Sequence, residues 1–256
     1  MMEKIIFSEN SFKDIKENIL KNSGVISINF FNAVDIFSFK KIPEFRACLK
    51  NKNIKNINNI DGISVAIPLS IINLKKVRRL QGPTFTDKFL KDKELNEGKK
   101  HFFIGVEQGN IEKVLERYPN LKNGKIKGHN LPYVKGLFFP GNEIKILANK
   151  INHFNPDYLW IGMGSPKQQI LTNQIFDKIK VKKFFNVGVA MEFIKGSRKR
   201  APEIFQKTGL EWLYRLFDDF KLIRNRTPRI IFGTFLSFFI AKLKNKEFEW
   251  KKRFYL

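Results

Sequence analysis

Asp61 is the acidic residue of this sequence best placed for acid–base chemistry. It follows residues 54–60, which read as a strand, and it precedes Gly62. Because ligands of open α/β sheets bind at the carboxyl ends of the strands, a carboxylate at this position could serve as general base for a substrate hydroxyl. An Asp-Gly pair is also typical of a turn without a chemical role. Asp61 is therefore a candidate base, and a plain turn is the alternative.

A turn with two glycines, residues 162–168, joins another predicted strand to a predicted helix. It reads G-M-G-S-P-K-Q. Glycines let the backbone turn tightly, and the N–H groups at the start of a helix suit a phosphate group. The turn lacks the full dinucleotide-binding pattern and the Gly-Lys-Ser/Thr end of a phosphate loop. It could bind phosphate, and a simple connection between strand and helix is the alternative.

Other charged and metal-ligating residues give weaker signals. Arg78-Arg79, shortly before Gly82, could clamp a diphosphate or end a helix in solvent, and their spacing does not distinguish the two. The sequence has no Asp-x-Asp, and its one adjacent acidic pair is Asp218-Asp219. One cysteine excludes an internal disulfide framework, and three scattered histidines make a histidine metal site an unfavoured interpretation. The sequence thus gives no positive sign of a metal or of another cofactor.

The elements that must position these residues alternate between strand and helix. We predict strands at residues 24–31, 54–60, 101–106, 158–163 and 184–189, and helices at residues 35–48, 84–96, 110–118, 142–153 and 166–180. This alternation predicts an α/β fold with a Rossmann-like parallel sheet flanked by helices. Residues 1–195 are expected to form this catalytic core.

The composition changes after Gly196, where arginine becomes frequent. The chain has a formal net charge of +24, and seven of its 11 arginines lie in the last 62 residues. The apolar stretch 230–243 is shorter than the roughly 20 residues that cross a bilayer, so we expect it to lie in the membrane interface. An ordinary core helix is the alternative. Residues 196–256 are predicted to form a basic amphipathic helical appendage that binds an anionic membrane surface and completes the active site.

Two blocks of the sequence resemble the signatures of the WecG/TagA/CpsF family of bacterial glycosyltransferases, classed as glycosyltransferase family 26. Residues 155–168 read N-P-D-Y-L-W-I-G-M-G-S-P-K-Q, and residues 200–216 read R-A-P-E-I-F-Q-K-T-G-L-E-W-L-Y-R-L. The resemblance extends from about Gly24 to Arg224 and includes a Ser-x-Asn in place of the family's Thr-x-Asn, the Asp-Gly pair, an Arg-x-x-Gly, and the stretch 188–196.

The resemblance implies an inverting, metal-independent transfer of an N-acetylmannosamine-type sugar (ManNAc or ManNAcA) from a UDP-sugar. The acceptor would be undecaprenyl-diphosphate-linked N-acetylglucosamine, in the biosynthesis of a cell-surface polysaccharide or teichoic acid. Glu3 and Glu9 interrupt the start of the chain, which has no apolar run and so gives no sign of a secretory signal. We therefore expect a cytoplasmic protein, peripheral on the inner face of the cell membrane. A homo-oligomer stays open, and nucleic acid is not expected as a partner.

The resemblance also implies roles for individual residues. Asp61 matches the catalytic base, Ser27 and Asn29 match an active-site polar pair, and Arg79 matches a diphosphate-binding arginine. The remaining substrate-binding residues are expected in the glycine turn, at a position near the nucleotide where the family usually has Asp, and in the appendage: Gly164, Pro166, Lys167, Gln168, Glu192, Arg200, Arg215 and Arg224. Gln168 is expected to face the substrates, and the three arginines to hold the diphosphates.

The chain departs from the family at Gly82-Pro83-Thr84, where members commonly read Gly-Ser-Asp. This departure leaves open the transfer of another hexose, such as glucose or galactose, to a lipid-linked intermediate of a capsule or exopolysaccharide. Two alternatives belong to other classes. A nucleic-acid-binding protein would fit the sequence pI of about 10.0 and the interspersed aromatic residues. A catalytically inactive scaffold at the membrane is the second.

Overall fold

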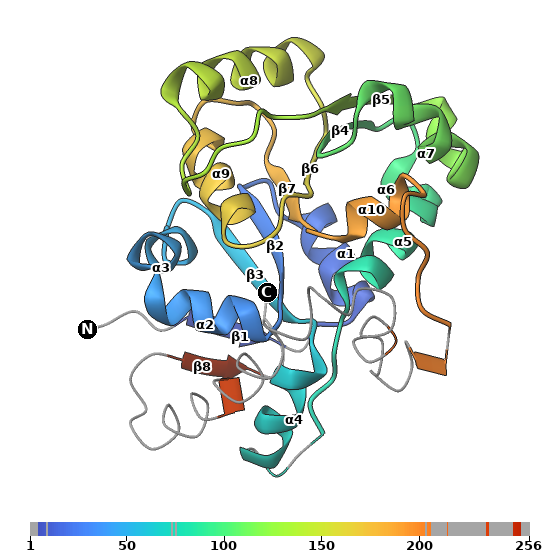
Figure 1. Ribbon diagram of the computed structural model, residues 1–256. Coiled ribbons are helices and arrows are strands. Elements are labelled where there is room, and N and C mark those ends of the chain that lie inside the picture. Colours follow the sequence, from blue (N-terminus) through green and yellow to red (C-terminus); the bar gives the residue numbers. More distant parts are fainter. Residues whose placement is uncertain are drawn as a thin grey trace.

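The computed structural model describes residues 5–8, 10–72, 74, 76–202, 204–205, 214, 234–235 and 248–251. Its centre is a sheet of eight strands (Figure 1): β1 (Ile5–Ser8), β2 (Ile26–Phe31), β3 (Lys55–Ile60), β4 (Lys100–Ile104), β5 (Lys125–His129), β6 (Tyr158–Ile161), β7 (Lys183–Asn186) and β8 (Phe248–Lys251). The helices are α1 (Phe12–Lys21), α2 (Ala33–Lys41), α3 (Pro43–Leu49), α4 (Ile63–Ile72), α5 (Gly82–Lys91), α6 (Lys93–Asn96), α7 (Ile111–Arg117), α8 (Gly141–Phe154), α9 (Lys167–Ile175) and α10 (Ala190–Ile194), with short 3₁₀ turns η1 (Gln108–Asn110) and η2 (Pro119–Asn123).

The strands lie in the order β5-β4-β6-β7-β2-β3-β1-β8, and every neighbouring pair is parallel. All strands therefore end at one edge of the sheet, which is the edge where ligands of such folds bind. The predicted Rossmann-like parallel sheet flanked by helices is confirmed.

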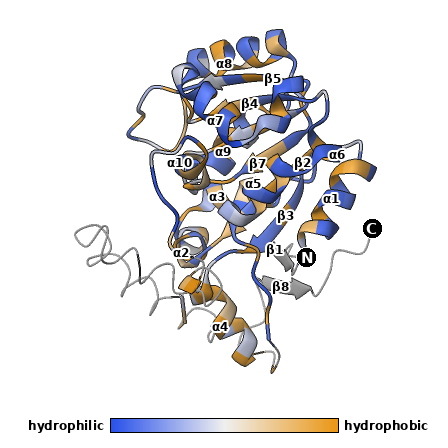
Figure 2. Cartoon of the chain, turned by 90° about the vertical axis from the view of Figure 1, so that its right-hand side faces the viewer, coloured by the Kyte–Doolittle hydropathy of each residue, from blue (hydrophilic) through white to orange (hydrophobic). Residues whose placement is uncertain are grey.

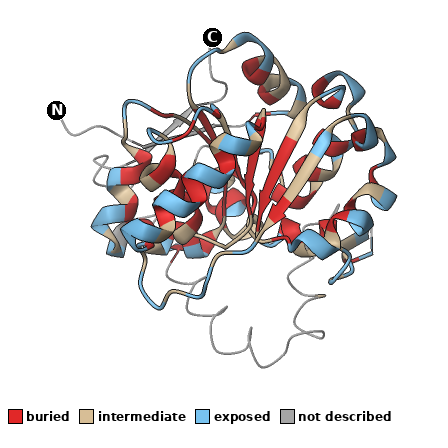
Figure 3. Ribbon diagram, turned by 90° about the horizontal axis from the view of Figure 1, so that it is seen from above, coloured by how far each residue is buried: buried red, intermediate tan, exposed pale blue. Residues whose placement is uncertain are grey.

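Alternate residues of the central strands face two helical layers, because successive side chains of a strand point to opposite faces. On one face, Ile28 and Phe185 pack with side chains of α1, α5, α7 and α10. On the other face, Phe184 packs with α8 and α9, and Phe31 packs with α2, α3 and α4. Figure 3 shows the buried strands between helices whose outer sides are exposed. The sheet is thus covered on both faces, as parallel sheets require.

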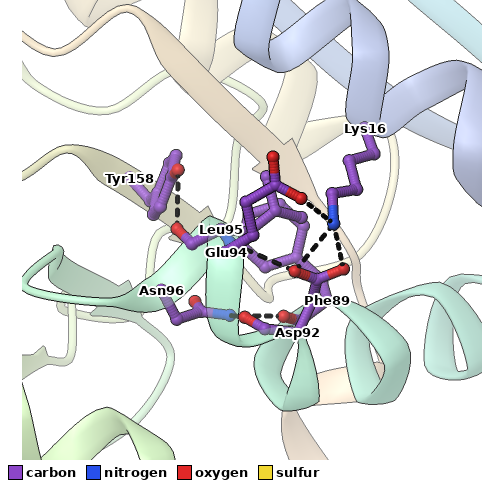
Figure 4. A network of polar contacts seen from close by, with 7 residues as sticks. All are labelled: Lys16, Phe89, Asp92, Glu94, Leu95, Asn96 and Tyr158. Atoms are coloured by element: carbon purple, nitrogen blue, oxygen red, sulfur yellow. Dashed lines mark hydrogen bonds and ion pairs between the residues drawn. The ribbon is translucent and has the colours of Figure 1, made fainter.

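A polar network fastens α1 to the α5–α6 junction, away from the carboxyl ends of the strands (Figure 4). The ammonium of Lys16 lies 2.7 Å from a carboxylate oxygen of Asp92 and 2.7 Å from one of Glu94. Asp92 also accepts a hydrogen bond from the N–H of Leu95, which caps the short helix α6. The hydroxyl of Tyr158 donates to the Leu95 carbonyl at 2.9 Å. Lys16, Asp92 and Glu94 thus have a structural role, which is to hold α1 against the α5–α6 junction.

Several predicted elements differ in their limits from the observed ones. The helix predicted at residues 35–48 is two helices, α2 and α3, because Pro43 has no N–H to continue the first and suits the start of the second. The strands predicted to reach residues 106 and 163 end at Ile104 and Ile161. A glycine follows each of them, and Gly105 has φ of 102°, where a strand cannot continue.

Most of the predicted appendage, residues 196–256, lies outside the described residues. One described part of it is β8, which pairs in parallel with β1 from Ile5 opposite Phe248 to Ser8 opposite Lys251. The sequence predicts a helical appendage for this region. The end of the chain instead supplies a strand to the same sheet that carries the candidate base. Among the described residues, no helix has the length and apolar character needed to cross a membrane.

Candidate functional site

Asp61 lies at the carboxyl end of β3, where the sequence places it. Its backbone N–H donates to the carbonyl of Phe31, the last residue of β2, at 2.9 Å. One carboxylate oxygen accepts a hydrogen bond from the N–H of Gly82 at 3.1 Å. Asp61 is half-buried, so it borders solvent while it accepts this hydrogen bond. This arrangement suits a group that must take a proton from an incoming hydroxyl.

The first turn of α5 connects Asp61 to Arg200. Gly82 in this turn binds Asp61, and the hydroxyl of Thr84, two residues later, accepts a hydrogen bond from the guanidinium of Arg200 at 3.2 Å. The same guanidinium lies over the ring of Phe193 at 5.9 Å. One predicted appendage arginine is therefore brought to the turn that holds the candidate base. Arg215 and Arg224 lie outside the described residues.

Glu192, in α10, is engaged by its own neighbours. One carboxylate oxygen accepts from the Ser197 hydroxyl at 2.6 Å, and the other lies 2.9 Å from the ammonium of Lys195. Burial acts to raise the pKa of Glu192, but these two hydrogen bonds and the charges of Lys195 and Arg198 together lower it. Glu192 is thus held as a carboxylate, and its predicted place near a nucleotide stays a prediction.

Two cations predicted beside phosphate lie on different segments. Lys167, the first residue of α9, donates to the carbonyl of Val134, and its ammonium lies 5.4 Å from the ring centre of Tyr133. Arg79 is half-buried on the connection between α4 and α5, three residues before Gly82. Arg79 is therefore close in sequence to the turn that binds Asp61, whereas Lys167 is directed to the loop before α8.

A row of buried polar side chains crosses β7, β2 and β3. The amide of Asn186 donates to the hydroxyl of Ser27 at 3.0 Å and to the side-chain oxygen of Asn29 at 2.9 Å. Asn29 in turn donates to Asn58 at 3.0 Å, and Thr172 of α9 donates to Asn186 at 3.1 Å. The predicted pair Ser27 and Asn29 is thus brought together, and the sequence reading missed Asn186, which joins them.

Gln168, predicted to face the substrates, is buried in the first turn of α9. Its amide nitrogen donates to the carbonyl of Asn186 at 3.3 Å, and its oxygen accepts from the N–H of Gly188 at 3.0 Å. Its own N–H donates to the carbonyl of Gly164, which has φ of 78°. Pro166 occupies the N-cap position of α9 and makes no side-chain capping bond. In this structure Gln168 fixes the turns after β6 and β7 to each other, and its contact with substrate stays a prediction.

Asp35 and Ser165 belong to this edge as well. Ser165 lies in the predicted glycine turn but was not among the predicted site residues, and Asp35 was not predicted at all. One carboxylate oxygen of Asp35 accepts from the N–H of Asn32 at 2.7 Å. Among the described residues, its other oxygen and the buried hydroxyl of Ser165 have no hydrogen-bond partner. Burial, with a smaller contribution from the charge of Asp61, raises the pKa of Asp35 to about 7, against the lowering effect of the Asn32 N–H. The Asn32-to-Asp35 spacing signals only a helix start.

The edge therefore presents one half-exposed carboxylate, a second buried carboxyl, and guanidinium and backbone N–H donors around the first turn of α5. Such a set can remove a proton from a hydroxyl and stabilise the negative charge of a departing phosphate. Within the part of the chain that the structure describes, no three His, Cys, Asp or Glu side chains are grouped as a metal ion would require.

Comparison with known proteins gives one consistent result. A sequence model of the glycosyl transferase WecG/TagA/CpsF family matches residues 5–248. The N-acetylglucosaminyldiphosphoundecaprenol N-acetyl-beta-D-mannosaminyltransferase of Staphylococcus aureus strain MRSA252 is 31% identical over 192 residues, which cover 73% of this chain and 69% of that protein. The protein of the same name from strain NCTC 8325 / PS 47 is 30% identical over the same shares.

Proposed function

The chain belongs to the WecG/TagA/CpsF family of glycosyl transferases, and from this we propose that it transfers an N-acetylmannosamine-type sugar, ManNAc or ManNAcA, from UDP to undecaprenyl-diphosphate-linked N-acetylglucosamine. It is a hexosyltransferase, and the names of its relatives support the transfer of an N-acetylmannosaminyl group and this acceptor. The observation that carries the proposal is the position of Asp61, at the carboxyl edge of the sheet and bound to the turn that also binds Arg200.

In the proposed reaction, Asp61 takes the proton of an acceptor hydroxyl as its oxygen attacks the anomeric carbon. The new glycosidic bond forms while the bond between that carbon and the diphosphate oxygen breaks. The electron pair of the broken bond leaves with UDP, so attack from the opposite face inverts the anomeric centre. Arg79 and Arg200 would stabilise the charge that develops on the diphosphate. We propose that these donors make a metal ion unnecessary.

A second donor class deserves a direct test because of Pro83 and Thr84. Pro83 and Thr84 stand where members of the family commonly have Ser and Asp. They lie in the turn that contacts both Asp61 and Arg200. A change at this turn would alter how the donor is held. Another hexose, such as glucose or galactose, is therefore the alternative donor, with a lipid-linked intermediate of a capsule or exopolysaccharide as acceptor.

The proposed location of the protein in the cell follows from the nature of the acceptor. A polyprenyl chain keeps the acceptor in the bilayer, so the enzyme has to work at a membrane surface. The net charge of +24 favours the anionic inner face of the cell membrane. We propose a peripheral protein at that face.

Incubation of the purified chain with a short-chain, water-soluble diphosphate-linked N-acetylglucosamine and a panel of UDP-sugars tests the function. We expect mass spectrometry to detect a mass increase of one N-acetylhexosamine, or its uronic acid, with the mannosamine donors only, and equal yield in excess EDTA. Transfer of glucose or galactose alone would establish the alternative donor. Loss of product in EDTA that Mg²⁺ restores would refute the metal-independent mechanism, and failure to bind any UDP-sugar would favour an inactive scaffold.

A further inference from the structure

Helix α4 (Ile63–Ile72) is apolar on nearly all sides and yet presents large side chains to solvent. It reads I-S-V-A-I-P-L-S-I-I. Ile67 is 49% exposed, Ile71 is 58% exposed, and Leu74 just beyond the helix is 94% exposed. Figure 2 shows α4 as an apolar helix that extends from the body of the molecule. A soluble surface helix normally turns only one apolar stripe inward, so these outward isoleucines need an explanation.

The other side of α4 is anchored in the core. Val65, Ala66 and Leu69 are buried in the cluster that also contains side chains of α2 and α3. This packing fixes the helix to the body and directs Ile67 and Ile71 away from it. The exposed isoleucines are therefore held in place by the fold.

The position of α4 relates it to the candidate site. The helix begins two residues after Asp61, at the edge where the parallel strands end. In Figure 1 it lies beyond the ends of β2 and β3, at the end of the molecule opposite α8. Any surface that α4 contacts would therefore lie on the same side of the molecule as the candidate base.

The charges around α4 identify the kind of surface. No Asp or Glu occurs between Asp61 and Asp87, and the helix is followed by Lys75, Lys76, Arg78 and Arg79. Lys76 and Arg78 are exposed. An apolar helix with cations at its end matches the interface of an anionic bilayer, where apolar side chains enter the acyl boundary and cations meet lipid phosphates. A second copy of this chain, also at +24, would be repelled.

We propose that α4 inserts Ile67, Ile71 and Leu74 into the headgroup boundary of an anionic bilayer and so turns the edge that carries Asp61 toward the membrane. Ten residues rise only about 15 Å as a helix, so α4 enters the interface without crossing the bilayer. The inference rests on the proposed function in one respect, because an acceptor diphosphate at the headgroup level would then meet the carboxyl edge of the sheet.

A fluorescent label on α4 tests the proposal directly. Cys48 is buried and burial raises the pKa of its thiol to about 11, so an added surface cysteine should react selectively. The variant Ile71→Cys carries an environment-sensitive dye on α4. The control variant Ile146→Cys carries the same dye on α8, where Ile146 is 47% exposed. With vesicles of equal parts phosphatidylglycerol and phosphatidylcholine, we expect a blue shift and a several-fold rise in emission at Ile71→Cys and no change at Ile146→Cys.

Three results would overturn the proposal. The first is unchanged emission at Ile71→Cys when vesicles are added. The second is a blue shift that already exists in dilute buffer, because the rest of the chain would then cover α4. The third is a shift that follows protein concentration without vesicles, which would indicate a second copy. Transfer to the water-soluble acceptor is measured on the same proteins, so failure of the proposed reaction is recorded separately from failure of α4 to enter the bilayer.

A matched pair of variants measures the contribution to binding. Ile67→Gln with Ile71→Gln removes the exposed apolar groups of α4, and Leu20→Gln with Ile146→Gln removes comparable groups from α1 and α8, where Leu20 is 51% exposed. Burial of two half-exposed isoleucines predicts vesicle binding weaker by about tenfold or more in the first variant. The second variant should bind as the parent does. Equal binding by all three proteins would also refute the proposal.

Discussion

At the scale of single residues, Asp61 and Asp35 differ in ways that assign them different tasks. Asp61 is half-buried and accepts a hydrogen bond from the N–H of Gly82, whereas Asp35 is fully buried and accepts one from the N–H of Asn32. A base must reach a substrate, which suits Asp61. A buried carboxyl with a raised pKa can instead change the charge around that base with pH.

The variant Asp61→Asn tests the assignment of the base. Asparagine keeps the size of the side chain and an oxygen for the Gly82 N–H, but it cannot accept the proton of the acceptor hydroxyl. We expect turnover to fall by about 10² to 10⁴ while the affinity for the UDP-sugar stays nearly unchanged. Initial rates and calorimetric titration with donor give the two quantities. A folded Asp61→Asn protein with parental turnover would show that the proton goes elsewhere.

The variant Asp35→Asn tests the buried carboxyl through the pH dependence of stability. In the folded protein the pKa of Asp35 is about 7, above its ordinary value of 3.8. Below about pH 4, Asp35 is protonated in both the folded and the unfolded protein, so its burial does not reduce the free energy of unfolding through ionisation. Between about pH 4 and pH 7, Asp35 is ionised in the unfolded chain but protonated in the folded protein, so the free energy of unfolding of the parent falls as the pH rises. Above about pH 7 Asp35 is ionised in both states, and the loss of free energy stays constant. Asparagine resembles the protonated form and avoids this loss.

We therefore expect the stability gain of Asp35→Asn, measured by urea unfolding, to be about 2.5 kcal/mol larger at pH 8 than at pH 5. Asp14→Asn is the matched control, because Asp14 occupies the same capping-box position in α1 but remains partly exposed. Because this carboxylate is not buried, its replacement should give a smaller gain in stability at pH 8 than Asp35→Asn does. A gain at Asp35→Asn that does not depend on pH would contradict the raised pKa.

The residue scale also shows what the sequence can reveal about the site. Asp61 was predictable because a strand pattern followed by Asp-Gly places a carboxylate at the sheet edge. Asp35 was not, because its spacing from Asn32 reports a helix cap and says nothing of burial or of the nearby Asp61. Asn186 was equally hidden, since an asparagine at the end of an apolar strand has no pattern that points to partners on another strand.

At the scale of elements, periodicity predicted the central strands and failed where apolar residues were continuous or rare. β5 reads K-I-K-G-H and has one large apolar residue, too few for a strand pattern. α4 is apolar throughout, so it has no polar face from which a helical period can be read. Both elements depend on tertiary contacts, β5 on its pairing with β4 and α4 on the cluster it shares with α2 and α3.

Close packing between turns sets where the strands end. A Cβ atom on Gly105 would lie 2.9 Å from the carbonyl oxygen of Gly162, so the turns after β4 and β6 touch through their backbones. The sequence showed glycines in both places but could not pair them, because they are far apart in the chain. The ends of β4 and β6 are therefore fixed against each other, and the candidate base stands at the end of another strand, β3.

At the scale of the whole molecule, the end of the chain returns to the first strand. β8 pairs with β1, and the buried hydroxyl of Thr234 donates to the carbonyl of Ala33, at the start of α2, at 3.2 Å. We predicted a core of residues 1–195 and an appendage of residues 196–256. Because β8 belongs to the appendage and pairs with β1 of the core, the two parts share one sheet. Removal of the appendage should affect both stability and membrane binding.

Two truncations separate these effects. Truncation after Asn245 removes β8 but keeps the apolar stretch 230–243, and truncation after Pro228 removes both. Each leaves β1 as an unpaired edge, so we expect both to unfold more easily than the parent and to associate more readily. The Pro228 truncation should lose more stability than the Asn245 truncation, because it also lacks the buried Thr234 that bonds Ala33. Only the shorter protein loses Arg229, Lys242 and Lys244, each worth about 1 kcal/mol near an anionic surface, together with the apolar groups between them.

Vesicle binding should therefore be weaker for the Pro228 truncation than for the Asn245 truncation by about a hundredfold, with a remainder that α4 supplies. Sedimentation with anionic vesicles measures the difference, and urea unfolding measures the stability of each protein, so that binding is compared where both are folded. If both truncations bind vesicles equally, residues 230–243 do not bind the membrane. Adding the two α4 substitutions to the Pro228 truncation completes the test, because binding that persists in this protein would have to come from a third surface.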